Sequence, residues 1–344
     1  MESICALHGC MAVPPKVTGD PRNEMLCDLL EVRITGFELP AESRTDARER
    51  NLVIEQALLY PGGFISLLEI EDAVTRALAE DLGRAGDVTS IATIPASTPC
   101  RTVLVARKPG TISGLPLVAA CLRKLAPDIE IKPQARDGDS VAAKTVLMRI
   151  NGDARAVLSA ERVSLNFLQH LSGIATATAA FVHKAGGGKT RICCTRKTTP
   201  GLRALEKYAV RCGGGFNHRF GLDDAILIKD NHVAVAGGIR AVLERARAAA
   251  GHLVKIEIEV DSLNQLQEVL DCGLADVVLI DNFDVASMKK AVAMVAGRLV
   301  IEASGGITLD TIAEIAATGV DYASSGALTH SAPALDLSMT IEPA

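Results

Sequence analysis

The sequence predicts an α/β protein in which a module of interleaved strands and helices precedes a (β/α) barrel, complete or not. Its 344 residues are enough for roughly two domains of about 150 residues each. Apolar residues make up 48% of the chain and aromatic residues only 3%, so the cores must consist mainly of Ala, Val, Leu and Ile. Strand and helix patterns alternate from residue 191 onward, which is typical of a parallel sheet with helical crossovers.

Residues 1–63 read as an N-terminal extension of unknown role. Breaks at Pro14-Pro15 and Gly19-Asp20-Pro21 interrupt a weak periodicity, and Tyr60-Pro61-Gly62-Gly63 ends the segment. We assign residues 64–172 to the first folded domain and residues 173–327 to the barrel. We expect the tail, residues 328–344, to pack back on the first domain.

The first domain mixes helical and extended patterns. Leu67, Ile70 and Val74 begin an apolar stripe at helical spacing that runs to Leu82, and Gly83 closes this helix. A polar, glycine-bearing turn follows over residues 80–90. Further strands are expected at 101–107, 129–131 and 146–150, and further helices at 119–125 and 154–184.

Strands and helices alternate through the barrel region. Strand patterns occur at 191–195, 225–228, 255–260, 276–280, 298–303 and 321–325. Helix patterns occur at 200–210, 233–250, 262–271, 284–296 and 308–317. The sequence has no G-x-G-x-x-G fingerprint, which favours a barrel over a doubly wound, dinucleotide-binding sheet.

Composition argues against several classes of protein. The net charge is −5 and there is no long basic block, which argues against nucleic acid as a partner. The nine cysteines include no C-x-x-C pair, which argues against a zinc site and indicates reduced thiols. No apolar run approaches the ~20 residues of a membrane-spanning helix, and the acid-rich N-terminus is atypical of a transit peptide. We therefore expect a cytoplasmic protein that does not bind membranes.

Polar side chains cluster where the barrel strands end, which is where barrels carry their active residues. In chain order they are Thr195, Arg196, Lys197, His218, Arg219, Lys229, Glu257, Glu259 and Asp281. After the first strand, Arg196 and Lys197 precede a helical pattern that opens at Pro200. Adjacent cations and free backbone N–H groups at a helix start make a natural anion site.

Small residues follow the last two barrel strands. The loops are Ser304-Gly305-Gly306 and Ser324-Ser325-Gly326. Small residues let backbone N–H groups approach an anion, and the final loops of a barrel are a common phosphate site. Glycine is also common in loops that bind nothing, because it permits tight turns. The prediction of a phosphate site therefore depends on two such loops following consecutive barrel strands.

Carboxylates and cations together predict a ligand that carries several negative groups. Glu259 and Asp281 end neighbouring strands, and Mg²⁺ prefers one or two such carboxylates plus ligand phosphates. The same carboxylates could instead pair with Lys197 and Lys229, and both interpretations are compatible. The basic groups are Arg162, Arg196, Lys197, His218, Arg219 and Lys229. The guanidinium fork suits carboxylate ligands in particular.

From about residue 66 to the end, ordered motifs resemble the quinolinate phosphoribosyltransferase (decarboxylating) family. They include Glu80-Asp81-x-Gly83-x-x-Gly86-Asp87-x-Thr89-Ser90, Glu161-Arg162-x-x-Leu165-Asn166-Phe167, Thr195-Arg196-Lys197-Thr198, Lys207-Tyr208-Ala209-Val210-Arg211, Gly213-Gly214-Gly215-x-Asn217-His218-Arg219, Leu227-Ile228-Lys229-Asp230-Asn231-His232 and Glu257-Ile258-Glu259-Val260. Ser324-Ser325-Gly326 departs slightly from the family pattern but keeps a small polar residue.

The resemblance implies an N-terminal α/β sandwich domain followed by an open, incomplete α/β barrel, in a homodimer with a shared active site. It implies phosphoribosyl transfer from phosphoribosyl pyrophosphate to quinolinate, with loss of CO₂, in NAD biosynthesis. By the same resemblance, Arg162 reaches the site from the other subunit. Arg196, His218 and Arg219 hold the quinolinate carboxylates. The residues that handle phosphoribosyl pyrophosphate and its Mg²⁺ are Lys197, Lys229, Glu259 and Asp281.

Two alternatives remain open from the sequence. A nicotinate phosphoribosyltransferase, or a related pyrophosphorylase-like protein of molybdenum transport, has a similar barrel but needs no site for a second carboxylate. Arg162, Arg196 and Arg219 together favour quinolinate. A non-catalytic phosphate-binding barrel would explain the small-residue loops, but it would not require Glu259 and Asp281 near Lys197.

Overall fold

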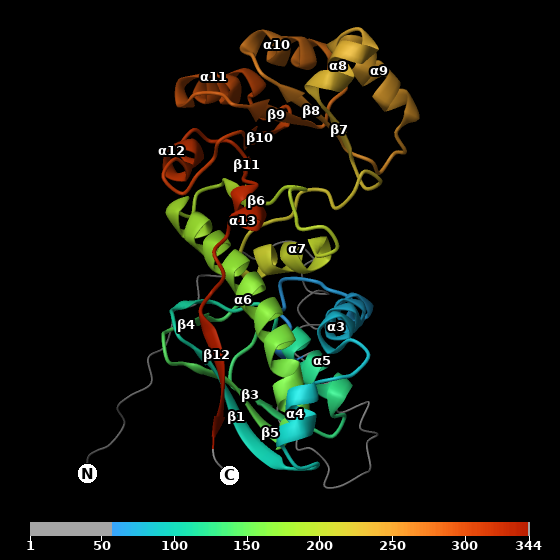
Figure 1. The fold of residues 1–344 in the computed structure, drawn as a ribbon. Helices are drawn as coiled ribbons and strands as arrows, with labels where there is room; N and C mark the ends of the chain where they lie inside the picture. Colours follow the sequence, from blue (N-terminus) through green and yellow to red (C-terminus); the bar gives the residue numbers. More distant parts are fainter. Residues whose placement is uncertain (1–56, 343–344) are drawn as a thin grey trace, which may run out of the picture. The chain divides into compact units, whose positions relative to one another are not determined.

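The computed structural model describes residues 57–342 of the chain (Figure 1). Residues 1–56, most of the expected N-terminal extension, lie outside the described residues. The end of that extension packs inward, since Leu58 is fully buried and its carbonyl accepts a hydrogen bond from the Asp137 N–H at 2.9 Å. The packed part of the chain therefore begins before residue 64.

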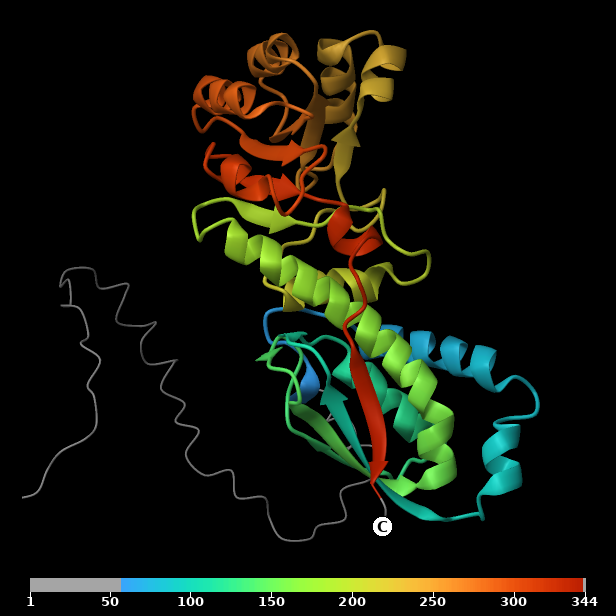
Figure 2. The same ribbon diagram turned by 60° about the vertical axis from the view of Figure 1, so that its left-hand side comes forward.

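A four-stranded antiparallel sheet lies at the centre of the first domain. Its order is β12-β1-β5-β3, built from β1 (Pro99–Ala106), β3 (Glu130–Pro133), β5 (Val146–Asp153) and β12 (Leu337–Glu342). The edge strand β12 comes from the C-terminal tail and runs beside β1 (Figure 2), in a register that pairs Leu337 with Ala106. The tail thus supplies one strand of the first domain. A small ladder joins β2 (Gly110–Thr111) to β4 (Ser140–Val141).

Four helices accompany this sheet. They are α3 (Leu67–Leu82), α4 (Val88–Thr93), α5 (Leu115–Leu125) and α6 (Ala154–Lys184). A capping box of Ser66 and Glu69 starts α3. The predicted turn at 80–90 was wrong at its end, because Asp87 caps the short helix α4 by accepting the Ser90 N–H. A helix of six residues is too short to show a clear apolar period.

The long helix α6 belongs to both hydrophobic cores. Val157 and Leu171 lie in the first core, whereas Phe181 lies in the core of the barrel. The C-terminal tail crosses α6 at Gly173, where a Cβ atom would lie only 2.2 Å from the Pro333 carbonyl oxygen. Glycine is therefore required at this crossing, because no other residue leaves the space.

Six parallel strands form the second sheet, in the order β6-β11-β10-β9-β8-β7. They are β6 (Arg191–Cys193), β7 (Ile226–Ile228), β8 (Ile256–Val260), β9 (Val277–Asp281), β10 (Val300–Ser304) and β11 (Tyr322–Ser324). The first strand, β6, pairs with the last, β11. Within residues 57–342 no ladder joins β6 to β7, so the barrel is open there, as the family resemblance implies.

The opening of the barrel coincides with an unusual helix. The connection from β6 to β7 contains α7 (Arg203–Cys212), whose Leu205, Tyr208 and Val210 pack into the core of the first domain. α7 was expected to cover the barrel like the other crossover helices. Because it packs elsewhere, it does not bring β7 back alongside β6.

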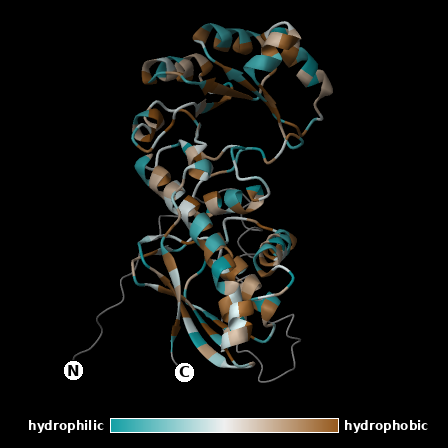
Figure 3. Cartoon of the chain, viewed as in Figure 1, coloured by the Kyte–Doolittle hydropathy of each residue, from teal (hydrophilic) through white to brown (hydrophobic). Residues whose placement is uncertain are grey.

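The remaining helices belong to the barrel and its end. They are α8 (Asp230–Ala236), α9 (Ile239–Ala249), α10 (Leu263–Cys272), α11 (Val285–Val295), α12 (Ile312–Ala316) and α13 (Ala327–His330). The prediction of a single helix over 233–250 was wrong. Gly237 and Gly238 have φ angles of 89° and 118° and separate α8 from α9. The barrel helices mix hydrophobic and hydrophilic residues (Figure 3), and buried ones such as Leu243 and Leu266 lie in the barrel core. Among the described residues, no helix has the length and apolarity to cross a membrane.

Candidate active site

A cavity of about 780 Å³ is lined by residues from the carboxyl ends of the barrel strands and the loops beside them. It brings together predicted site residues that are far apart in the chain. These are Thr195, Arg196, Lys197, His218, Arg219, Lys229, Glu259, Asp281, Ser304, Gly305, Gly306, Ser325 and Gly326. They gather because parallel strands present all their carboxyl ends at the same edge of a sheet.

Arg162 is the predicted site residue that the structure does not bring to this cavity. It lies on α6 with an exposed side chain, and the cavity wall does not include it. A single chain therefore presents the cavity without this arginine.

The loop after β6 is anchored to two helices. The Thr195 hydroxyl accepts the Lys197 N–H at 3.0 Å. Further along the loop, the Thr199 N–H donates to Glu206 Oε2 at 3.2 Å. Glu206 is fully buried on α7, and its other oxygen lies 2.8 Å from His170 Nε2 on α6. These contacts stabilise the turn that carries Arg196 and Lys197.

Two arginines at the cavity have free hydrogen-bonding capacity. The Nε atoms of Arg196 and Arg219 are buried and, within the described residues, have no hydrogen-bond partner. Burial and the nearby charge of Arg196 lower the pKa of Arg219 below its usual value, so the two guanidinium groups are close enough to repel. Unsatisfied buried donors are costly, and an anionic ligand would satisfy both.

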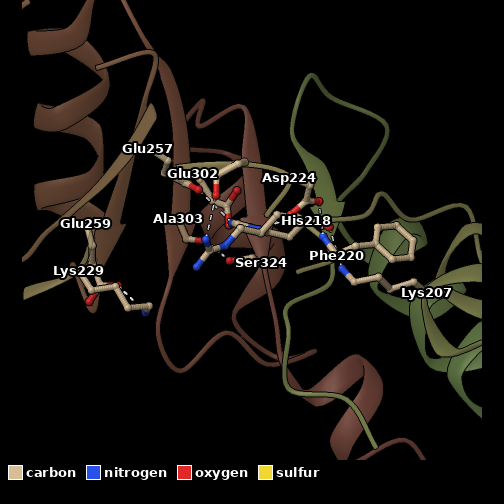
Figure 4. A network of polar contacts seen from close by, with 12 residues as sticks. Lys207, His218, Phe220, Asp224, Lys229, Glu257, Glu259, Glu302, Ala303 and Ser324 are labelled. Atoms are coloured by element: carbon tan, nitrogen blue, oxygen red, sulfur yellow. Dashed lines mark hydrogen bonds and ion pairs between the residues drawn. The ribbon is translucent and has the colours of Figure 1, made fainter. Parts of the chain in front are cut away.

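His218 is held by contacts at both ring nitrogens. Nε2 lies 3.0 Å from a Glu257 oxygen and 3.6 Å from Glu302 (Figure 4). Nδ1 accepts the Arg219 N–H at 2.7 Å, so the proton of the neutral ring is on Nε2 and points to Glu257. Burial alone would lower the pKa of His218, but the hydrogen bond to Glu257 and the charge of Glu302 outweigh it and raise this pKa. The Arg219 N–H opposes that rise, because an imidazolium Nδ1 cannot accept a hydrogen bond.

The sequence interpretation missed Glu302, which is buried in the cavity wall. Only 5% of Glu302 is exposed, and its Oε1 has no hydrogen-bond partner in the described part of the chain. Burial raises its pKa to about 7, and the charge of Glu257 adds to this effect. Glu302 lies two residues before Ser304 on β10, which is the same spacing that drew attention to Glu257 and Glu259 on β8. That period-2 signal could have found it.

Lys207 is a second residue whose role the sequence did not reveal. It is fully buried on α7, and its Nζ donates to the His218 carbonyl at 2.7 Å and to Cys194 Sγ at 3.1 Å. Its ammonium group also lies 5.0 Å from the centre of the Phe220 ring. Lys207 therefore fixes the loop that carries His218 (Figure 4).

Glu259 and Asp281 lie on the neighbouring strands β8 and β9, and both are half-buried in the cavity wall. Glu259 pairs with Lys229 at 2.8 Å, as the ion-pair interpretation expected for that lysine. Asp281 accepts a hydrogen bond from the Asn282 side chain at 2.7 Å. Their oxygens are the donors that Mg²⁺ prefers, and an ion pair on one side leaves carboxylate lone pairs available.

A second cluster of possible metal ligands lies beside the cavity and contains one histidine and two glutamates. Ligand atoms of His218, Glu257 and Glu302 lie within 4.8 Å of one another. The His218 Nε2–H is directed at Glu257, however, and the positive charge of Lys207 acts on both His218 and Glu302. The Lys207 ammonium group and the His218 proton thus already offset the negative charge of this cluster. The cluster therefore fits a metal less well than Glu259 and Asp281 do.

The two small-residue loops differ in what they offer a ligand. Gly305 and Gly306 have φ angles of 89° and 60°, and a Cβ on Gly305 would lie 2.2 Å from Asn282 Oδ1. Glycine is therefore needed for the tight loop after β10. In the other loop, the Ser325 N–H donates to the Cys193 carbonyl and its hydroxyl donates to Ile307 O at 2.8 Å. Ser325 is thus already engaged within the protein.

Comparison with known proteins gives two adjoining family matches. The N-terminal domain of quinolinate phosphoribosyl transferase matches residues 87–172. The C-terminal domain of the same family matches residues 174–340. Together they cover most of the first domain and the barrel.

Curated relatives and a solved structure agree with these matches. A probable nicotinate-nucleotide pyrophosphorylase (carboxylating) of Bacillus subtilis is 42% identical over 274 residues, covering 80% of this chain and 94% of the relative. Nicotinate-nucleotide pyrophosphorylase (carboxylating) of Mycobacterium leprae is 44% identical over 275 residues, covering 78% and 96%. The structure of the nicotinate-nucleotide pyrophosphorylase from Francisella tularensis is 36% identical, with a TM-score of 0.78, covering 81% of this chain and 98% of that one.

Proposed function

Because the chain belongs to the quinolinate phosphoribosyltransferase family, we propose that it transfers phosphoribosyl from phosphoribosyl pyrophosphate to quinolinate. The products are nicotinate mononucleotide, pyrophosphate and CO₂, and the reaction is a step of NAD biosynthesis. The observation that carries the proposal is one cavity that combines Arg196 and Arg219, the carboxylates Glu259 and Asp281, and the loop from Ser304 to Gly306.

Arg196 and Arg219 bind the two carboxylates of quinolinate. Their buried, unpartnered Nε atoms support this assignment, since a dicarboxylate would satisfy both. His218 has both ring nitrogens engaged by Glu257 and the Arg219 backbone, so it orients this side of the cavity more than it donates to the ligand. Nicotinate has a single carboxylate and would leave one of these donors unsatisfied.

Lys197, Glu259 and Asp281 act at the ribose. As pyrophosphate departs, the ribose gains positive charge, and carboxylates fixed nearby stabilise that charge electrostatically. Lys197 and Lys229 neutralise the leaving group, and the loop from Ser304 to Gly306 binds phosphate oxygens. The ring nitrogen of quinolinate attacks once it is held in line, so positioning supplies much of the rate.

Glu259 and Asp281 would hold a Mg²⁺ ion together with the phosphates of the substrate. The ion would supply charge neutralisation of the pyrophosphate leaving group. The half-buried oxygens of these two residues, on adjacent strands at the cavity, support this assignment.

We also propose a homodimer in which Arg162 completes the neighbouring subunit's cavity. The exposed position of Arg162 on α6, outside the cavity of its own chain, supports this arrangement.

Free cysteines such as Cys193 and Cys212 in the described residues agree with a cytoplasmic location, where thiols stay reduced.

The direct test supplies phosphoribosyl pyrophosphate and Mg²⁺ to the full chain, with either quinolinate or nicotinate. We expect nicotinate mononucleotide from quinolinate. Quinolinate labelled in the carboxylate next to the ring nitrogen should release labelled CO₂. Omission of phosphoribosyl pyrophosphate is the control and should stop both products. Turnover of nicotinate in preference to quinolinate would favour the nicotinate enzyme instead, and no turnover of either would favour a binding protein.

A further inference from the structure

The proposed reaction needs a proton at carbon, and this inference rests on that proposed function. When CO₂ leaves the ring carbon next to the nitrogen, the C–C electron pair stays on that carbon. The positive ring nitrogen stabilises the pair, but the product carries a C–H bond at this position. A general acid in the cavity must therefore supply one proton for each turnover.

Three carboxyl groups line the cavity in the described structure, and two are poorly suited to this task. Glu259 already has an oxygen engaged by the Lys229 ammonium group at 2.8 Å. Asp281 is half-buried and already accepts a hydrogen bond from the Asn282 side chain at 2.7 Å. The third is Glu302, which is 5% exposed and whose Oε1 has no hydrogen-bond partner among the described residues.

The position of Glu302 suits contact with the ring. It shares a face of β10 with Ser304 and lies about 7 Å deeper along the strand, below the loop proposed for phosphate. His218 Nε2 lies 3.6 Å from it, and the charge of Glu257 acts on both Glu302 and Arg219. The acid thus lies at the end of the cavity where the arginines would hold the substrate carboxylates.

Burial and five neighbouring groups together set the pKa of Glu302. These groups are His218 before β7, Glu257 on β8, Ser324 on β11, Lys207 on α7 and Cys193 on β6. Burial, together with the negative charge of Glu257, raises the pKa of Glu302 to about 7, although His218, Ser324 and Lys207 oppose the rise. A substrate with two carboxylates adds further negative charge and favours the neutral acid.

We propose that Glu302 is the general acid that protonates the ring carbon after CO₂ has left. Its O–H bond breaks as the new C–H bond forms, and the electron pair left by CO₂ becomes that C–H bond. Glu302 becomes a carboxylate and regains its proton from water when the product leaves. No oxidant or further reactant is needed.

The test replaces Glu302 by glutamine in the full chain. Glutamine has the size and charge of the protonated acid but cannot give up a proton. We expect kcat to fall by about 100-fold or more, with the KM for quinolinate changed less than about threefold. Glu268→Gln on the exposed face of α10 is the matched control and should behave as wild type.

The pH profile and the solvent isotope effect distinguish proton donation from a structural role. Wild-type kcat should fall as pH rises through about 7, because Glu302 then loses its proton. Glu302→Gln should lack this decline and show a larger decrease of kcat in D₂O, since proton delivery becomes limiting. Glu302→Asp keeps an acid and should retain the decline, which provides a second variant if the glutamine protein does not fold.

Two outcomes would overturn the inference while leaving the proposed function intact. In the first, Glu302→Gln keeps more than about a hundredth of wild-type kcat, because the least effect expected of a general acid is about 100-fold. In the second, a wild-type chain that converts quinolinate shows no decline of kcat near pH 7, which would point to another proton donor at the cavity, such as Lys197. A wild-type chain with no quinolinate turnover would instead overturn the proposed function, and this inference with it.

Discussion

Asp137 is a fully buried carboxylate whose oxygens accept three hydrogen bonds. The N–H groups of Gly114 and Leu115 donate to it at 2.9 and 3.0 Å, and the Tyr208 hydroxyl donates at 3.1 Å. The carboxylate therefore caps α5 and links it to α7. The sequence predicted this helix only from residue 119, whereas the structure begins α5 at Leu115.

Removal of the Asp137 side chain should destabilise the fold. Asp137→Ala would leave two buried N–H groups and one buried hydroxyl without an acceptor, and each such group costs about 1–3 kcal/mol. We expect the free energy of unfolding in urea to fall by about 3 kcal/mol or more. Asp139→Ala, at a side chain that is 41% exposed, is the control and should cost less than about 1 kcal/mol. Equal losses in both variants would contradict the capping role.

The stability that depends on Asp137 should also vary with pH. Burial raises the pKa of this carboxyl from 3.8 to about 7, so the folded state binds the proton more tightly than the unfolded chain. Its favourable contribution is complete below pH 3.8 and is lost as pH rises to about 7. Compared with Asp137→Asn, the wild-type free energy of unfolding should decrease across this interval, which urea titrations at several pH values would measure. A constant difference would show that the folded and unfolded pKa values are alike.

Arg196 and Lys197 are neighbours in the chain, but we predict different defects when each is lost. Lys197→Ala should reduce kcat by about 100-fold or more while the fold is kept, because its charge acts at the departing pyrophosphate. Arg196→Ala should mainly raise the KM for quinolinate, since it removes one carboxylate contact. Steady-state kinetics and circular dichroism of both variants provide the measurement. Unchanged quinolinate affinity in Arg196→Ala would count against its role.

At the scale of elements, the strand β12 joins the end of the chain to the first domain. Leu337 is 3% exposed, pairs with Ala106 on β1, and its carbonyl accepts a hydrogen bond from the Gln169 side chain at 2.8 Å. The partner of this strand could not be read from local periodicity, because β1 lies more than two hundred residues earlier in the chain.

A charge placed in β12 should test this pairing. Leu337→Asp would bury an unpaired carboxylate and remove apolar burial, so we expect a loss of about 3 kcal/mol or more in unfolding free energy. Thr340→Asp, at an exposed position of the same strand, should cost less than about 1 kcal/mol. Thermal and urea unfolding of both variants measure the difference. A small effect at Leu337 would indicate that the tail contributes little to the first domain.

The helix α7 shows a limit of prediction at the same scale. The sequence predicted a helix over 200–210, and the structure contains one at Arg203–Cys212. The spacing says which face is buried but not which core receives it. Tyr208 and Val210 pack in the first core, so the barrel remains open beside β6.

At the scale of the whole molecule, the proposed shared site can be tested by mixing two inactive chains. A chain with Arg162→Ala keeps its own Lys197, and a chain with Lys197→Ala can supply the missing Arg162. In a mixed dimer one of the two cavities is then complete, so activity should recover to about half that of the wild-type dimer. Purified mixed dimers, with each inactive homodimer as control, provide the assay. Absence of recovery in verified mixed dimers would argue against a shared site.

The sequence alone determined the alternation of strands and helices in the barrel, because each element has a local period and a local stop signal. It also determined which residues stand at the strand ends, and parallel strands necessarily bring those ends to one edge. Only the tertiary structure decided that Glu302 is buried beside His218 and Glu257, and that Lys207 holds the His218 loop. The burial of Glu302 and the charges around it depend on residues far apart in the chain. A local sequence pattern therefore cannot predict them.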